Sequence, residues 1–211
     1  GECPPMVHFT ELIEQFHNVG FIHRDITHTN IMVRNGKAHI IDFGMAVRHG
    51  TSVFQHEGTF LFAAKEVIDA HISDESITYE YAHDLISLVR VWMYLDSRDR
   101  LRAELLRLYS LVNWYGNDLR NNREFCEFIN FWLVLEVAVP IYKKGLELAA
   151  ATDYEGLKKF FQRHDRSPSL AGWKDHKKLI KHYSPKRKAV DDVDERKPKK
   201  LKKTPKKQKK T

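Results

Sequence analysis

The chain has 211 residues, of which 35 are Lys or Arg, 28 are Asp or Glu and two are Cys. This length allows one well-buried core with some chain left over, and two cysteines do not form the disulfide framework of a small secreted protein, so we expect a reducing compartment. We find no secretory signal and no apolar run long enough to cross a bilayer, so no membrane partner is expected.

Positive charge is concentrated near the C-terminus. Residues 181–211 hold 14 Lys or Arg and 4 Asp or Glu, whereas residues 1–180 hold 21 basic and 24 acidic residues and are nearly neutral. The composition turns polar at residue 166 and becomes low in complexity from residue 184. No core can form from such a segment, so we expect a linker over 166–183 and a disordered basic tail over 184–211.

The first predicted element is an amphipathic helix from His8 to Val19. Its apolar residues recur at helical spacing, and Gly20 follows as a C-cap. The helix runs directly into His23-Arg24-Asp25.

The next stretch carries most of the residues with chemical potential. Asn30 follows Asp25 by five residues, and Asp42-Phe43-Gly44 begins twelve residues after Asn30. Two apolar runs lie between them, joined by Asn35-Gly36, which is the strongest short signal for a β-hairpin. A short hairpin returns the chain almost to its start, so we expect Asp42 to lie beside Asn30.

The order of these pieces resembles that of a protein kinase, with a catalytic loop at 23–30, a metal-binding loop at 42–44 and an activation segment at 44–66. The resemblance implies a mainly α fold with a short β-hairpin, the C-lobe of a protein kinase, over residues 1–165. Counterparts of the glycine-rich loop, the strand lysine and the glutamate helix are not found in these residues. We therefore expect the N-lobe to be absent from this chain.

The resemblance also implies the roles of individual residues. Asp25 would orient the acceptor hydroxyl, and the same reaction would use Mg²⁺ and ATP. The catalytic residues would be Arg24, Asp25 and Thr59, the metal ligands Asn30 and Asp42, and the residue at the adenine floor Met32.

Four further residues would give structural support. His23 and Phe43 would stack in an internal spine, and Asp84 would hold the backbone of the catalytic loop. Glu66 would form a buried ion pair with an arginine, for which the sequence offers Arg120, Arg123 and Arg163.

Within the kinases, the chain looks most like the fungal-type protein kinase family. The motifs behind this resemblance are His-Arg-Asp-Ile-Thr at 23–27, Ile-Asp-Phe-Gly-Met-Ala at 41–46, Gly-Thr-x-x-Phe at 58–62 and His-Asp-Leu-x-Ser at 83–87. Lys65 stands where most kinases have a proline, and this family normally lacks that proline. Thr27 stands where most serine/threonine kinases have a lysine.

The remaining pattern predicts helices. An apolar helix begins at Asp84 and continues through Trp92 and Leu95, followed by helices over 101–114, 123–148 and 153–162, the last with Asp153 as a plausible N-cap. Pro140 should kink or end the helix over 123–148. Within it, we expect the aromatic residues to pack in the core and residues 131–139 to be buried; the aromatic set is Phe125, Phe128, Phe131 and Trp132.

Three functions are compatible with these features. The first is a protein kinase, serine/threonine type, that transfers the ATP γ-phosphate to a protein substrate, here as a C-lobe fragment inactive until a partner or a missing N-lobe completes the cleft. The second is a non-catalytic kinase-like binding module acting in the nucleus. The third, a small-molecule phosphotransferase of the aminoglycoside type, ranks last because those enzymes usually have Gly in place of Arg24 and lack the activation segment.

The basic tail predicts nuclear localisation. Two basic clusters stand ten residues apart, the layout of a two-part signal read by an import receptor; they contain Lys186, Arg187, Lys188, Lys199, Lys200, Lys202 and Lys203. The alternative is weak, salt-dependent nucleic-acid binding by the tail. Without import, the expected location is the cytoplasm.

Overall fold

The structure, a computed structural model, describes residues 5–97, 99–114, 119 and 122–166. Within these residues the helices are α1 (Pro5–Asn18), α2 (Lys65–Ser73), α3 (Tyr81–Asp96), α4 (Asp99–Leu111), α5 (Arg123–Ala138), α6 (Pro140–Ala150) and α7 (Tyr154–His164). The strands are β1 (Phe21–Ile22), β2 (Ile31–Arg34), β3 (Lys37–Ile40), β4 (Val47–Arg48), β5 (Ser52–Val53) and β6 (Ile77–Thr78), and a 3₁₀ turn, η1, spans Phe43–Met45.

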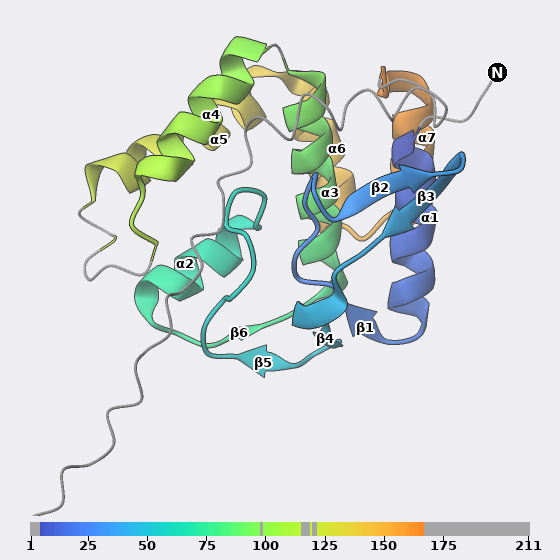
Figure 1. Ribbon diagram of the computed structural model, residues 1–211, viewed down its shortest axis with the longest axis horizontal. Helices are drawn as coiled ribbons and strands as arrows, with labels where there is room; N and C mark the ends of the chain where they lie inside the picture. Colours follow the sequence, from blue (N-terminus) through green and yellow to red (C-terminus); the bar gives the residue numbers. More distant parts are fainter. Residues whose placement is uncertain (1–4, 98, 115–118, 120–121, 167–211) are drawn as a thin grey trace, which may run out of the picture.

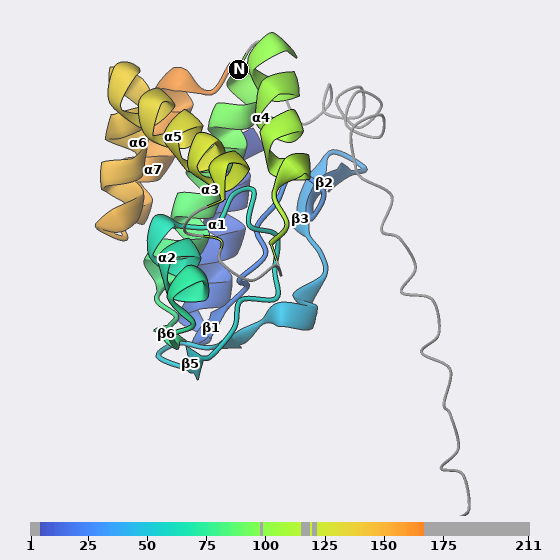
Figure 2. The same ribbon diagram turned by 90° about the vertical axis from the view of Figure 1, so that its left-hand side faces the viewer.

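Helix α3 lies at the centre of the core. Trp92, with 0% of its surface exposed, contacts Tyr142 of α6 and Phe161 of α7 edge-on. Helix α6 packs on α3, α1 packs on α7, and α4 packs on α5 (Figures 1 and 2). Full burial of one such aromatic side chain contributes roughly 2–3 kcal/mol to folding. The described chain is therefore mostly helical with short strands, an arrangement compatible with the predicted kinase-like fold.

The predicted hairpin is confirmed. Strands β2 and β3 pair antiparallel with Ile31 opposite Ile40. Asn35 and Gly36 at the turn both have positive φ, 52° and 70°, as a two-residue turn of this hand requires. Two other short antiparallel pairs, β1 with β4 and β5 with β6, tie the following segment back to the body.

Pro140 ends the helix that the pattern predicted over 123–148. The chain forms two helices there, α5 and α6, whose axes differ by 101°. Pro140 occupies the first turn of α6, where its missing N–H breaks no helical hydrogen bond. Among the described residues no single helix has the length and apolarity to cross a membrane; α5 and α6 reach that threshold only when taken together.

The prediction that residues 131–139 are buried was wrong. Val134 is 62% exposed and Val137 is 76% exposed, because α5 turns only one face toward the core. Of the predicted aromatic set, Phe125, Phe128 and Trp132 are buried, whereas Phe131 is only half-buried against the core. Helical periodicity identified the buried stripe, but the apolar run also extends onto the opposite face.

The last described helix closes the fold onto its beginning. Asp153 caps α7 as predicted, since its side chain accepts a hydrogen bond from the Gly156 N–H. Just after α7, the Asp165 carboxylate accepts a hydrogen bond from the Met6 N–H at 3.1 Å. Apart from Arg166, the predicted linker over 166–183 and the predicted tail over 184–211 lie outside the described residues.

Candidate active site

The catalytic-loop segment begins after β1 and is held in place by Asp84 of α3. Asp84, 1% exposed, accepts hydrogen bonds from the backbone N–H groups of His23 at 2.6 Å and Arg24 at 2.9 Å. Arg24 has a positive φ of 68°, a conformation that a residue with a side chain seldom adopts. The two hydrogen bonds to Asp84 therefore stabilise a strained turn immediately before Asp25.

Asp25 is buried, and hydrogen bonds hold both of its carboxylate oxygens. Its Oδ1 accepts from the backbone N–H of Thr59 at 2.8 Å, and its Oδ2 accepts from Nδ2 of Asn30 at 2.8 Å. Asn30 Nδ2 also donates to the Asp25 carbonyl at 2.9 Å. The structure thus brings three of the sequence-predicted site residues together, with Thr59 contributing its backbone.

The hairpin returns the chain to Asn30. The Ile41 N–H donates to the Asn30 carbonyl at 2.9 Å. Asp42 is therefore the next residue after a direct backbone contact with Asn30. Asp42 is exposed and has φ 64°, in the left-handed region. A Cβ built on Gly44 would lie 3.3 Å from Asp42 Oδ1, so a residue with a side chain at position 44 would crowd the carboxylate.

The donor atoms available at Asn30 and Asp42 suit a hard divalent cation. Because Asn30 Nδ2 is used by Asp25, its amide Oδ1 is the atom left to bind a ligand. The Asp42 carboxylate is solvent-accessible, and oxygen ligands of these two types are those that Mg²⁺ prefers. The residues present therefore fit the Mg²⁺ ion that the sequence predicts, and the assignment stays a prediction.

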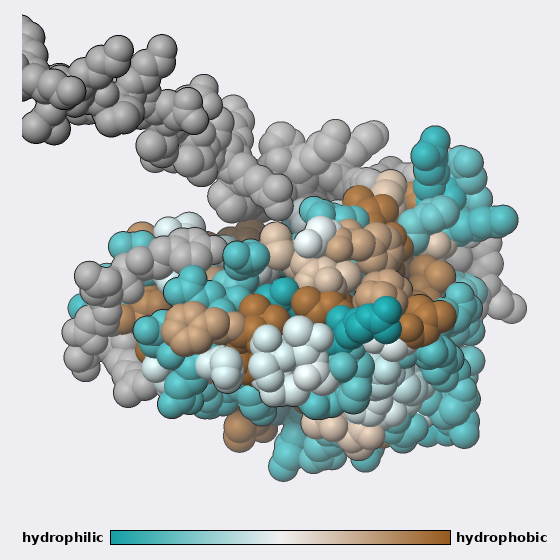
Figure 3. All heavy atoms as spheres, turned by 90° about the horizontal axis from the view of Figure 1, so that it is seen from below, coloured by the Kyte–Doolittle hydropathy of each residue, from teal (hydrophilic) through white to brown (hydrophobic). Residues whose placement is uncertain are grey.

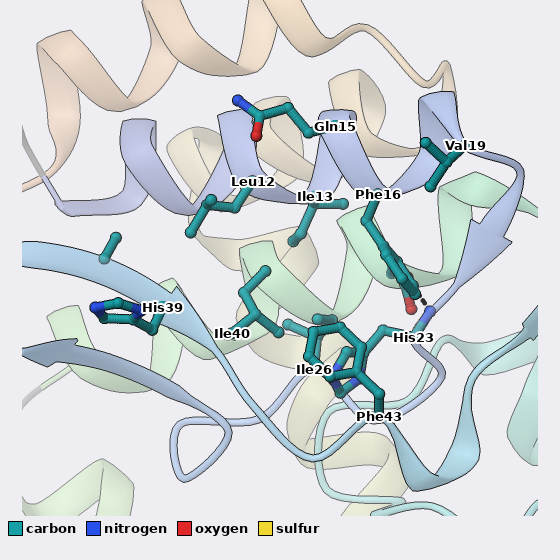
Figure 4. A pocket seen from close by; sticks show the side chains of 12 residues that line it. Leu12, Ile13, Gln15, Phe16, Val19, His23, Ile26, His39, Ile40 and Phe43 are labelled. Atoms are coloured by element: carbon teal, nitrogen blue, oxygen red, sulfur yellow. Dashed lines mark hydrogen bonds between the residues drawn. The ribbon is translucent and has the colours of Figure 1, made fainter.

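An aromatic cluster lies beside this loop. The ring centroids of His23 and Phe43 are 5.0 Å apart, and Phe16 of α1 lies 5.1 Å from Phe43. These rings border a hollow of about 340 Å³ whose other walls include Leu12 and Ile40 (Figure 4). The Phe43 side chain at the rim of the hollow is 49% exposed, so the hollow is open to solvent. The walls of the hollow are mainly apolar.

Met32, assigned to the adenine floor, is half-buried in β2 opposite His39. It does not line the hollow beside Phe43. Thr27 is 2% exposed, and its hydroxyl accepts from the Asn30 N–H at 3.2 Å. At position 27 the side chain therefore stabilises the loop and supplies no positive charge.

The activation segment is attached to the catalytic loop by contacts that the sequence did not reveal. Arg24 donates through Nη1 to the Met45 carbonyl at 3.1 Å, and its guanidinium lies 4.5 Å from the centre of the Tyr79 ring. The Tyr79 hydroxyl forms a hydrogen bond of 2.6 Å with Nδ1 of His56. Burial, followed by the nearby charge of Arg24, lowers the pKa of His56 to about 3, so this ring is neutral at pH 7.

At Gly58 the backbone passes close to the His56 ring and to the backbone of Arg24. A Cβ at position 58 would lie 2.8 Å from Cε1 of His56 and 2.9 Å from the Arg24 carbonyl oxygen. Those distances exclude a side chain without movement of the backbone. The Gly58-Thr59 pair was the available sequence signal here, but it did not point to Tyr79 or His56.

The predicted buried ion pair of Glu66 was wrong for two of its three candidate arginines. Glu66 is exposed in the first turn of α2, where the helix N-terminus favours its charge. Arg123 pairs instead with Glu127, no ion pair of Arg163 is found in the described part of the chain, and Arg120 lies outside that part.

A different arginine takes the buried position. Arg90, 4% exposed, donates to Glu136 through Nε at 2.9 Å and through Nη2 at 2.7 Å, and it also donates to the Ala63 carbonyl. The segment just before α2 is thereby tied to α3 and α5. The residues of the predicted nuclear signal, from Lys186 to Lys203, lie outside the described residues.

Comparison with known proteins identifies the same region. Residues 6–101 match the family model of the protein kinase domain. Sperm motility kinases 2B, 3A and 3B of Mus musculus are each 46% identical to this chain over 55 residues, a stretch that covers 25% of this chain and 11% of each relative. The matched stretch thus spans about a ninth of the length of these relatives. Together, the family match and the local similarity support a relationship of residues 6–101, a little under half of the chain, to the protein kinase superfamily.

Proposed function

We propose that this chain carries the catalytic and metal-binding part of a serine/threonine-type protein kinase, which transfers the γ-phosphate of ATP to a hydroxyl of a protein substrate. The observation that carries the proposal is the fixed Asp25 carboxylate, buried and hydrogen-bonded by Thr59 and Asn30. Phosphoryl transfer requires mainly positioning and electrostatic stabilisation, so a rigidly placed carboxylate is the feature to look for.

Within this proposal each residue has a defined task. Asp25 orients the acceptor hydroxyl and accepts its proton, and its two hydrogen bonds fix the direction of the carboxylate. Asn30 would hold Mg²⁺ through Oδ1 and Asp42 through its carboxylate. Bound Mg²⁺ supplies charge neutralisation at the phosphates. Met32 would contact the adenine, and Arg24 couples Asp25 to the activation segment through Met45 and Tyr79.

The neutral Thr27 affects the expected rate. Removal of one charge-stabilising group costs roughly 3 kcal/mol of transition-state stabilisation, equivalent to about a hundredfold in rate. We therefore expect slow phosphotransfer even when the cleft is complete.

The hollow beside Phe43 supports a role for a covering segment. Its walls are apolar and partly exposed, the kind of surface that a folded protein usually covers. Figure 3 shows apolar side chains across the middle of the face seen from below, with polar ones around them. We propose that residues 1–211 alone have little activity, and that an N-lobe or a partner packs over this hollow to complete the nucleotide cleft.

Assignment to the fungal-type protein kinase family is also part of the proposal. It rests on the motifs at 23–27, 41–46, 58–62 and 83–87 and on Lys65 in the place of a proline. In the structure Lys65 begins α2 and pairs with the exposed Asp69, so position 65 accommodates a residue other than proline. If Lys65→Pro markedly stabilised the chain, the absence of proline would be incidental, and this reason for preferring the family would be lost.

For location, we propose import to the nucleus through the basic tail. A fusion of residues 181–211 to a fluorescent cargo too large for passive diffusion should accumulate in the nucleus. The variant Lys199→Ala with Lys200→Ala should remain in the cytoplasm. Cytoplasmic cargo, or accumulation that the double variant does not reduce, would reject import and leave salt-dependent nucleic-acid binding as the role of the tail.

The second candidate function is a non-catalytic kinase-like binding module in the nucleus, and the open apolar hollow beside Phe43 favours it. Calorimetric titration of residues 1–211 with Mg²⁺ and ATP separates the two. The kinase proposal predicts weak binding that Asp42→Asn abolishes, whereas Asp74→Asn does not affect it. Asp74 is a matched control because it is another exposed aspartate with positive φ, 55°, at the end of α2.

Equal binding by both variants, or no binding at all, would favour the non-catalytic module. Phosphotransfer itself tests the expected inactivity. Rapid transfer by purified residues 1–211, abolished by Asp42→Asn, would overturn the need for a covering segment while supporting the kinase assignment.

A further inference from the structure

We propose that Arg90, Trp132 and Glu136 are positioning residues for the segment that joins Thr59 to α2. The inference rests on the proposed function, because it takes Asp25, which Thr59 contacts, as the carboxylate whose placement matters. The three residues belong to α3 and α5, and two of them donate hydrogen bonds to carbonyl groups of the segment. The sequence pattern pointed to none of them as a site residue.

The segment over residues 60–64 is buried throughout, yet it forms neither a helix nor a strand. Its backbone groups need partners, because a buried carbonyl left without a hydrogen bond is costly. One bond is internal, since the Ala63 N–H donates to the Phe60 carbonyl at 3.2 Å and closes a turn. The carbonyls of Leu61 and Ala63 instead accept hydrogen bonds from side chains of other elements.

Those two donors are Trp132 of α5 and Arg90 of α3. Nε1 of Trp132 donates to the Leu61 carbonyl at 3.0 Å, and Nη1 of Arg90 donates to the Ala63 carbonyl. The Arg90 guanidinium also lies over the Trp132 ring, 5.3 Å from its centre, so each side chain restricts the other. The turn over residues 60–63 is thus anchored to both α3 and α5.

Glu136 fixes the orientation of the Arg90 guanidinium. Its Oε1 accepts from Nε at 2.9 Å and from Nη2 at 2.7 Å, while Nη1 on the other side of the group is directed to Ala63. A guanidinium is planar with its N–H groups in fixed directions, so holding one edge determines where the remaining nitrogen points. The side chains of Arg90 and Glu136 are 5% and 17% exposed, so water competes little for these bonds.

The anchored turn determines where Thr59 lies. Thr59 directly precedes Phe60, the first residue of the turn, and its N–H donates to Oδ1 of Asp25 at 2.8 Å. Without the donors to Leu61 and Ala63 the turn gains freedom, and the Thr59 N–H loses its fixed direction. Side chains on α3 and α5 therefore act on the Asp25 carboxylate through the backbone of the activation segment.

The first test compares Trp132→Phe with Trp92→Phe in the full chain, using isotope-labelled protein. Both changes shorten a fully buried tryptophan and keep an aromatic ring, but within the described residues Nε1 of Trp92 has no hydrogen-bond partner to lose. Trp132→Phe should shift the Thr59 amide and Asp25 carboxyl resonances and speed hydrogen exchange of the Thr59 amide several-fold more than Trp92→Phe does. Equal effects of the two variants on Thr59 and Asp25 would overturn the proposal.

A second measurement needs no variant and compares two arginines. The Arg90 guanidinium should give separate, slowly exchanging Nη hydrogen resonances with nuclear Overhauser contacts to Ala63, because its hydrogen bonds prevent rotation. Arg123, whose side chain is 86% exposed, should give averaged resonances under the same conditions. Averaged resonances from Arg90 would reject the proposal even if Trp132→Phe does not fold.

Neither measurement uses nucleotide, so the positioning role and the proposed function can fail separately. Negative results in both experiments, with Mg²⁺ and ATP still bound by the unmodified chain, would remove the positioning role alone. The absence of Mg²⁺ and ATP binding by the unmodified chain would remove the proposed function, and the contacts of Arg90 and Trp132 would then serve the fold only.

Discussion

The backbone N–H of Thr59 donates to the Asp25 carboxylate across 2.8 Å and so joins the activation segment directly to the catalytic loop. The residues around this contact are tightly packed. Thr59 follows Gly58, which has no room for a side chain, and Gly58 touches His56, which is bonded to Tyr79. The position of Asp25 therefore depends on neighbouring residues that carry no charge.

Gly58→Ala tests this dependence. The added Cβ would lie 2.9 Å from the Arg24 carbonyl oxygen, so we expect a loss of roughly 1–3 kcal/mol of folding free energy, as for other overpacked sites. Urea denaturation measures the loss, and the Thr59 amide resonance should shift with it. Wild-type stability together with an unchanged Thr59 resonance would show that the segment moves away freely.

Two histidines should make the fold sensitive to acid. Burial lowers the pKa of His28 to about 4, and burial followed by the charge of Arg24 lowers that of His56 to about 3, from 6.5 in the unfolded chain. A lowered pKa in the folded state means that stability is intact above pH 6.5 and is lost as the pH falls toward the folded value. Each histidine contributes a slope of about 1.4 kcal/mol per pH unit in that window.

His28→Gln isolates one of these contributions. The histidine ring packs against Phe62 and Tyr94, and glutamine carries no titrating group. The variant should be less stable at neutral pH because it loses these contacts, but its stability should fall less steeply between pH 6.5 and about 4.5. Denaturation curves across that range provide the slope, and a slope equal to that of the wild type would contradict the assignment to His28.

The buried pair of Arg90 and Glu136 should contribute more to stability than the exposed pair of Arg123 and Glu127. Arg90→Met leaves Glu136 without its cation and removes a donor from the Ala63 carbonyl, which should cost roughly 3 kcal/mol. Arg123→Met, whose side chain is 86% exposed, should change thermal stability little. Similar losses from both variants would refute the distinction by burial.

Local chemistry made part of this structure predictable. Asn35-Gly36 specifies a turn with positive φ at both residues, Pro140 cannot continue a helix, and Asp153 caps one. Each of these features depends on a few neighbouring residues, so it could be predicted from the sequence. The order of Asp25, Asn30 and Asp42 along the chain could be read from the sequence in the same way.

The missed features depend on contacts between distant segments. Arg24 contacts Tyr79, which is 55 positions away in the sequence, and Arg90 contacts Glu136, which is 46 positions away. Spacing along the chain carries no information about such pairs. The exposure of Val137 was missed for a related reason, because an apolar residue identifies a buried face only when something packs against it.

The central claim, that Asn30 and Asp42 hold one divalent cation with ATP, is tested most directly by adding Mn²⁺ and ATP to labelled protein. The account predicts paramagnetic broadening centred on the Asn30 side-chain amide and on residues 41–44. Asp42→Asn should abolish this broadening, and Asp74→Asn should preserve it. Broadening centred elsewhere, or equal broadening in both variants, would contradict the claim.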